Sequence, residues 1–167
     1  MNENKKPLNK SGNFVGFITN SGNVQDINKP PKIIKIKPVH EDERGKIIDL
    51  IDGEEFVHAG IVTYQKGAIR GNHYHKKTEQ VNYILKGKIR YFTKDLSKKD
   101  SKVKEAILEK GDMIIDPPFE WHSQEALEES EMLFFTKKTR GMGEFEGDVF
   151  RIPREKIDNF KLSISEK

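Results

Sequence analysis

Short apolar segments separated by turn-forming residues follow one another along most of the chain. The segments that predict strands are Ile33–Lys37, Lys46–Ile51, Phe56–Tyr64, Ile69–His75, Gln80–Leu85, Lys88–Thr93, Val103–Leu108, Asp112–Asp116 and Met132–Thr136. Gly, Asp and Pro residues break the pattern between them, and Lys86-Gly87-Lys88 predicts a tight hairpin. Short strands at this spacing favour an all-β sandwich or barrel over alternating strands and helices.

The two ends of the chain differ from this central part. Residues 1–31 are rich in Asn, Lys, Gly and Ser, and their only apolar segment is Phe14–Ile18. That segment could add an edge strand to this chain or to a partner, or it could belong to a mobile leader. Pro153 stands where a short helix would begin. We therefore expect a leader over 1–31, a barrel over 32–152 and a short helix with a tail over 153–167.

Composition narrows the class of protein. The chain has 167 residues, enough for one domain, with 34% hydrophobic and 34% charged residues, so we expect a good core with polar tails. A net charge of +3 of mixed sign gives no electrostatic case for a nucleic-acid partner. Cysteine is absent, which excludes disulfides and thiol nucleophiles. No apolar run approaches the roughly 20 residues that span a bilayer, and no signal peptide is evident, so we expect a cytoplasmic protein without a membrane partner.

Two histidines, His73 and His75, alternate on one predicted strand and therefore point to the same side. A third, His122, could meet them from a distant strand. Three converging imidazoles together with a side-chain oxygen would form a divalent-metal site or an acid/base pocket. The candidate metals are Zn, Mn, Fe and Ni.

The spacing around these histidines resembles the two motifs of the cupin family. The matching residues are Gly67, His73, His75 and Gly87 in the first motif, and Gly111, Pro117 and His122 in the second. Phe119 and Ala126 replace the Gly and Asn of the second motif. The resemblance implies a cupin double-stranded β-helix, a jelly-roll barrel, over roughly residues 33–140.

The fourth position of the predicted site is ambiguous. Spacing to Gly87 assigns it to Gln80, where the family usually has Glu. Gln offers a neutral carbonyl oxygen, which is a weaker metal ligand than a carboxylate. A one-residue slip or bulge would instead turn Glu79 inward.

The segment Arg70–Lys77, together with Asp42–Gly45 upstream, is similar to the sugar-nucleotide cupins. These include deoxysugar 3,5-epimerases, 3,4-ketoisomerases and the cupin domain of capsule-biosynthesis enzymes. The resemblance implies that His73 or His75 removes a proton next to the keto group of a nucleotide-linked keto-deoxysugar in surface-polysaccharide biosynthesis. It also implies that the ketoisomerase type needs no metal, whereas the capsule type holds zinc.

Four residues near the histidines are candidates for substrate binding. Arg70 could grip a phosphate or carboxylate through its guanidinium fork, although an ion pair at the rim is the alternative. Asn82 should share the inner face with Gln80, and the face of Arg90 is not fixed by the pattern. Trp121 adjoins His122, where it is either a packing residue or a platform for the substrate.

Two other functions fit the same residues. One is a metal-dependent cupin of the oxygenase or lyase type, in which the three histidines and Gln80 or Glu79 hold the metal. The other is a cupin that binds a sugar or metabolite without catalysis. A small molecule is the expected partner in each case, and the expected assembly is a homodimer, because small barrels commonly pair through edge strands.

Overall fold

The structure is a computed structural model that describes residues 31–139 and 146–160. Its backbone contacts divide the chain into two units, which in the described part are Lys35–Glu55 and the remainder. In the first unit, strands β2 (His40–Asp42) and β3 (Gly45–Ile47) form an antiparallel hairpin. Arg44 closes its turn by donating hydrogen bonds to the carboxylate of Asp42.

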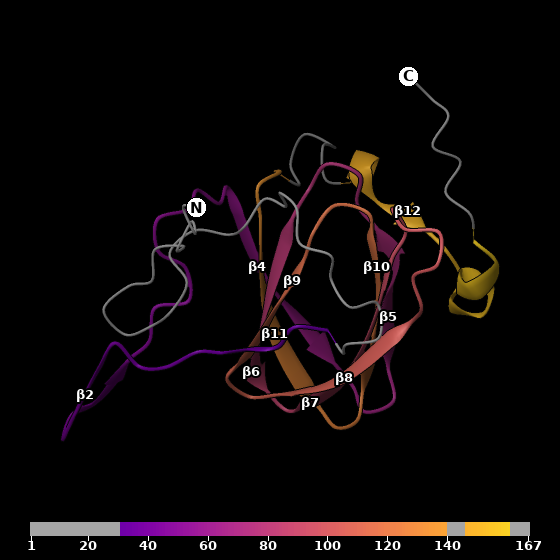
Figure 1. Cartoon of the computed structure of the whole chain (residues 1–167). Coiled ribbons are helices and arrows are strands. Elements are labelled where there is room, and N and C mark those ends of the chain that lie inside the picture. Colours follow the sequence, from indigo (N-terminus) through magenta and orange to yellow (C-terminus); the bar gives the residue numbers. More distant parts are fainter. Residues whose placement is uncertain (1–30, 140–145, 161–167) are drawn as a thin grey trace, which may run out of the picture. The chain divides into compact units, whose positions relative to one another are not determined.

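Two five-stranded sheets build the second unit (Figure 1). The first sheet has the order β1, β9, β6, β11, β4, and its strands are β1 (Ile34–Lys35), β9 (Asp112–Asp116), β6 (Gln80–Lys86), β11 (Ser130–Thr136) and β4 (His58–Tyr64). The second sheet has the order β12, β5, β10, β7, β8, and its strands are β12 (Phe150–Arg151), β5 (Ile69–Tyr74), β10 (Glu120–Ala126), β7 (Lys88–Asp95) and β8 (Lys104–Glu109). These elements make an all-β jelly roll, as the spacing of the predicted strands and the resemblance indicated.

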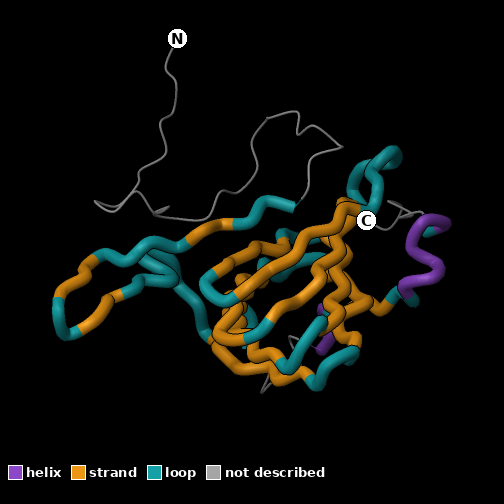
Figure 2. Tube along the Cα trace, turned by 90° about the horizontal axis from the view of Figure 1, so that it is seen from below, coloured by secondary structure: helices purple, strands orange, loops and turns teal. Residues whose placement is uncertain are grey.

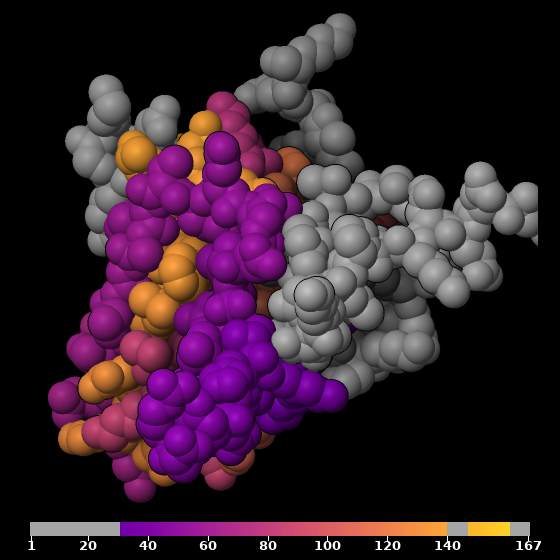
Figure 3. Space-filling view, turned by 90° about the vertical axis from the view of Figure 1, so that its left-hand side faces the viewer, coloured from indigo at the N-terminus to yellow at the C-terminus, as the bar shows by residue number. Residues whose placement is uncertain are grey.

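Sequence-distant strands lie side by side in both sheets. Strands β4 and β11 pair in antiparallel register from Ser130 opposite Tyr64 to Thr136 opposite His58, and they adjoin on the face shown in purple and orange in Figure 3. In the second sheet β10 lies between β5 and β7. These long-range pairings bring residues from three separate parts of the chain to one interior.

Two apolar clusters stabilise the barrel from opposite faces of the second sheet. One lies between the sheets and consists of Tyr64, Ile84, Ile89, Tyr91, Leu108, Ile114, Ala126 and Met132. The other consists of Tyr74, Phe92, Leu96, Trp121, Ile152 and Ile157. Because adjacent residues such as Tyr91 and Phe92 belong to different clusters, strand alternation assigns an inner face toward the first sheet and an outer face away from it.

Short 3₁₀ helices are the only helical elements in the described ranges 31–139 and 146–160: η1 (Glu146–Asp148) and η2 (Arg154–Asn159), shown in purple in Figure 2. Pro153 precedes η2 at its N-terminal cap, and Ile157 of η2 packs into the outer cluster. No helix among the described residues is both long enough and apolar enough to cross a membrane. Phe14–Ile18, expected to be either an edge strand or part of a mobile leader, lies outside the described residues.

The predicted strands are present with shifted ends, except that Lys46–Ile51 is a strand only up to Ile47. The prediction lacked the short strands β2 and β12 and the longer strand β10. The inward side chains of β10 are polar, with His122 and Gln124 facing the interior, so the sequence has no apolar alternation there. Strand β10 nevertheless supplies one of the three histidines.

Candidate functional site

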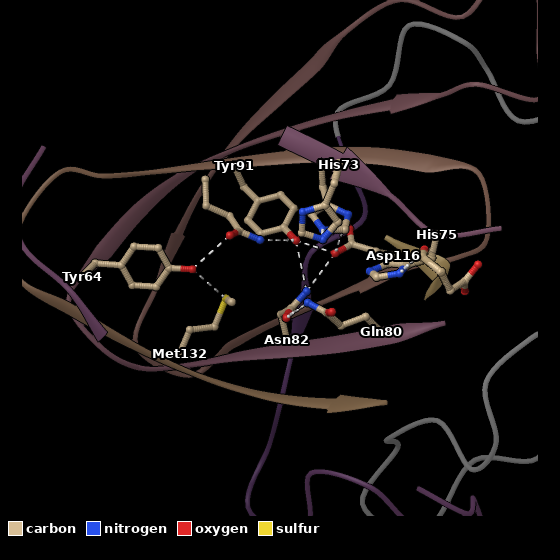
Figure 4. Close-up of polar contacts among 11 residues, drawn as sticks. Tyr64, His73, His75, Gln80, Asn82, Tyr91, Asp116 and Met132 are labelled. Carbon is tan, nitrogen blue, oxygen red and sulfur yellow. Dashed lines mark hydrogen bonds and ion pairs between the residues drawn. The ribbon is translucent and has the colours of Figure 1, made fainter. Parts of the chain in front are cut away.

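Three histidines converge at one end of the barrel interior (Figure 4). His73 lies near the end of β5, His75 directly follows that strand, and His122 lies opposite His73 on β10. One ring nitrogen from each lies within 4.8 Å of the others. The Nε2 atoms of His73 and His122 are 3.1 Å apart.

A β-bulge sets the direction of these side chains. His122 pairs with His73, but the next residue, Ser123, pairs with Gly71, so Asn72 is an extra residue in β5. Gly71 and Asn72 both have positive φ, +77° and +56°. A Cβ on Gly71 would lie 2.9 Å from the carbonyl oxygen of His122, so the site requires glycine both for its backbone conformation and for space.

The bulge also places Arg70 on the inner face. In a regular strand without the bulge, Arg70, three positions before His73, would lie on the opposite side. In the structure Arg70 pairs with Gln124, whose side chain faces the interior, and its guanidinium lies 5.6 Å from the ring centre of Tyr64. Arg70 is exposed, so its charge is accessible from solvent while its strand position belongs to the inner face.

Burial keeps all three imidazoles neutral at pH 7. It lowers the pKa of His73 to about 4, with the nearby His75 adding to the effect. Burial also lowers the pKa of His75, and it lowers that of His122 well below the usual value, helped by the two other histidines. A neutral imidazole offers one nitrogen lone pair, which can bind a metal or accept a proton.

A buried polar network lies beside the histidines. Asn82 donates hydrogen bonds to Asp116 Oδ2 at 2.8 Å and to Tyr91 Oη at 3.0 Å, and Tyr91 donates its own hydroxyl proton to Asp116. Gln124 donates to Tyr91 at 3.1 Å. Asp116 Oδ2 lies 3.4 Å from His122 Nδ1, so the network reaches the site directly.

Burial raises the pKa of Asp116 from 3.8 to about 8, although the hydrogen bonds from Tyr91 and Asn82 act in the other direction. Near pH 7 this carboxyl group is therefore largely protonated. Asp116 and Tyr91 were not among the site residues predicted from the sequence. A signal for Asp116 was available, because Ile114 and Asp116 share one face of a predicted strand that ends directly before Pro117.

Gln80 and Asn82 both face the interior, as predicted. The Gln80 amide is buried and donates to Asn82 Oδ1 at 2.8 Å. Glu79 instead lies 3.7 Å from the ammonium of Lys137 and is not part of the histidine cluster. Of the two candidates for the fourth position, the structure therefore brings Gln80 into the network that adjoins the histidines.

Two predicted substrate-binding residues lie elsewhere. Arg90 forms ion pairs with Glu105 at 3.2 Å and Glu125 at 3.4 Å on the outer face. Trp121 is fully buried in the outer cluster, where its indole N–H donates to the carbonyl of Ile152 at 3.4 Å. Strand alternation explains this, because Trp121 must point away from the side to which His122 points.

Divalent metals are suited to this set of donors. Three neutral imidazoles are ligands that Zn and other first-row metals accept, and the Gln80 carbonyl is the nearby neutral oxygen donor. The residues that would hold a metal are His73, His75 and His122. Without a metal, the same three side chains are candidates for acid/base groups.

Comparison with known proteins supports the fold. The model of a family described as Cupin matches residues 55–146. A dTDP-4-dehydrorhamnose 3,5-epimerase from Sulfolobus tokodaii is 21% identical, with TM-score 0.61, over 74% of this chain and 77% of that one. The 3,4-ketoisomerase QdtA from Thermoanaerobacterium thermosaccharolyticum, as a double mutant with TDP, is 23% identical, with TM-score 0.61, over 81% and 96%. A 3,4-ketoisomerase from Helicobacter canadensis is 20% identical, with TM-score 0.60, over 72% and 90%. No curated protein matches the chain in sequence.

Proposed function

This chain belongs to the cupin family, and from that premise we propose that it is an isomerase or epimerase of a nucleotide-linked keto-deoxysugar. The observation that carries the proposal is a half-buried neutral imidazole, His73, on the same inner face as the exposed cation Arg70. The similar folds of dTDP-sugar epimerases and ketoisomerases agree with this substrate class.

The proposed reaction is proton transfer at the carbon next to the keto group. A neutral imidazole is a suitable base near pH 7, and the enolate that forms needs a hydrogen-bond donor or a positive charge near its oxygen. His73 is the first candidate for the base because it is the only one of the three histidines with partial exposure. His75 is the second, since its ring centre lies 5.0 Å from that of His73.

Arg70 is the proposed contact for the diphosphate. A guanidinium forms paired hydrogen bonds with phosphate oxygens, and its charge does not depend on pH in the working range. In the structure its guanidinium contacts the face of Tyr64, and within residues 31–139 and 146–160 it forms no ion pair that phosphate binding would have to break.

The compactness of the three-histidine cluster favours a second candidate, a metal-dependent enzyme of the lyase or oxygenase type. A divalent metal held by His73, His75 and His122 would polarise a carbonyl oxygen of the substrate as a Lewis acid. In that case His73 would bind the metal and would not be free to accept a proton.

Hydrogen exchange tests the proposal. The protein is incubated in D₂O with dTDP-4-keto-6-deoxyglucose, and loss of carbon-bound hydrogen is followed by NMR. We expect exchange with wild type, at least 100-fold slower exchange with His73→Asn, and unchanged exchange with His58→Asn, a histidine on β4 outside the cluster. Arg70→Ala should raise KM for the nucleotide sugar, whereas Arg90→Ala on the outer face should not.

Absence of exchange by the folded wild type, with or without added metal, would refute the isomerase proposal. Binding of the nucleotide sugar without exchange would then favour the non-catalytic alternative. Turnover that requires a metal and proceeds without exchange would favour the metal-dependent candidate.

A further inference from the structure

Asp148 joins two segments that lie far apart in the sequence. Its carboxylate accepts backbone N–H groups from Lys76, Lys77 and Thr78 at 2.8 to 3.2 Å. These three residues directly follow His75. The side chain of Asp148 is buried, so these hydrogen bonds form away from water, where they are strongest.

The backbone of the same residue contacts the imidazole. The carbonyl oxygen of Asp148 lies 3.0 Å from His75 Nδ1. A carbonyl oxygen can only accept a hydrogen bond, so Nδ1 must carry the proton. In a neutral ring the lone pair is then on Nε2, the nitrogen on the far side of the ring from Asp148.

We propose that Asp148 is the positioning residue of the site, which fixes the tautomer and orientation of His75. The carboxylate holds the segment Lys76–Thr78, and through it the backbone of Asp148 is held beside the ring of His75. The carbonyl then selects the tautomer with the proton on Nδ1. Asp148 acts through His75 and does not itself contact the substrate.

This arrangement has a chemical use under either function of the site. A ring nitrogen with its lone pair fixed in one direction can bind a metal or accept a proton without first exchanging tautomers. The inference does not rest on the proposed reaction, because the tautomer is a property of the protein alone and can be measured without substrate.

The test is the tautomer of His75 measured by long-range ¹H–¹⁵N NMR at pH 8 in the presence of EDTA, with the resonances assigned from a His75→Asn variant. We expect wild type to show protonated Nδ1 and unprotonated Nε2. Asp148→Ala removes the carboxylate but keeps the backbone carbonyl, and it should move both nitrogen resonances at least halfway toward the average of the two tautomers. Asp148→Asn keeps one acceptor oxygen and should give a smaller shift in the same direction.

The matched control is Asp112→Asn. Asp112 is also buried, and its carboxylate accepts the backbone N–H of Glu109 at 2.9 Å on a different strand. This variant should lose stability without moving the His75 resonances, which separates positioning from a general loss of stability.

Two results would overturn the proposal. One is a wild-type spectrum with the proton on Nε2, a result that needs no variant to fold. The other is a folded Asp148→Ala or Asp148→Asn protein in which the His75 nitrogens keep their wild-type resonances.

Discussion

Replacement of Asp116 by Asn should remove a pH dependence of stability that this buried carboxyl group creates. The folded protein keeps the proton of Asp116 up to a pKa of about 8, whereas the unfolded chain loses it near 3.8. Between these values the folded state binds more protons at Asp116 than the unfolded state, so the contribution of this group to stability is complete below pH 3.8 and is lost as the pH rises through 8. An amide at this position has no proton to lose.

The contribution of Asp116 to the free energy of unfolding depends on the difference between the pH and its pKa in the folded state. At pH 7 the group is about one unit below that pKa, and one unit corresponds to about 1.4 kcal/mol of unfolding free energy. At pH 9 nearly all of this contribution is gone. Urea unfolding at several pH values between 7 and 9, with EDTA present, should therefore show wild type losing about 1.4 kcal/mol more than Asp116→Asn.

Other buried groups do not account for this difference. Burial also raises the pKa of Glu120 to about 7, and its contribution has the same sign, but it is present in both proteins and cancels in the comparison. His73, His75 and His122 are neutral in the folded state of both proteins and have the same unfolded state, so their contribution also cancels. Equal slopes for the two proteins would show that Asp116 is ionised in the folded state and would refute the reasoning.

Three further predictions concern the geometry of the site. Gly71→Ala should cost about 2 kcal/mol or more of unfolding free energy and should weaken metal binding, because φ is +77° and a Cβ would lie 2.9 Å from the His122 carbonyl; urea unfolding and calorimetry measure both. Trp121→Phe should cost about 1 to 3 kcal/mol by circular dichroism and leave KM unchanged, so a large rise in KM would contradict its place in the outer cluster. Elemental mass spectrometry should find close to one equivalent of divalent metal in protein reconstituted with zinc and dialysed. His122→Ala should hold much less, and equal amounts in both proteins would show that the histidines are not the ligands.

Strand alternation allowed the central part of the site to be predicted from the sequence. His73 and His75 are two positions apart, so any β-strand turns them to one side, and the two glycine-bounded motifs indicated that His122 would join them. Gln80 and Asn82 followed from the same rule. Such predictions need only the period of a strand and the correct strand assignment.

Residues whose position depends on long-range contacts could not be predicted. Asp148 reaches His75 across 73 residues of sequence, and no local pattern connects them. Arg70 was a candidate, but alternation alone would have placed it on the wrong face. The alternation pattern alone did not determine to which face of the sheet Arg90 points. That depends on the register in which β7 pairs with β10 after the hairpin at Gly87.

The bulge at Asn72 determines to which face of the sheet the residues upstream of it in strand β5 point. Deletion of Asn72 would leave Arg70 two positions before His73, so regular alternation would keep both on the inner face, with Arg70 still opposite Gln124. A change of Asn72 to Asp, which tolerates the same backbone conformation, would preserve the bulge. Two residues separate Arg70 from His73, whereas one separates their partners Gln124 and His122, so the shared orientation of the cation and the imidazoles depends on the bulge that absorbs the extra residue. A regular strand that kept Asn72 would instead turn Arg70 outward, away from the imidazoles.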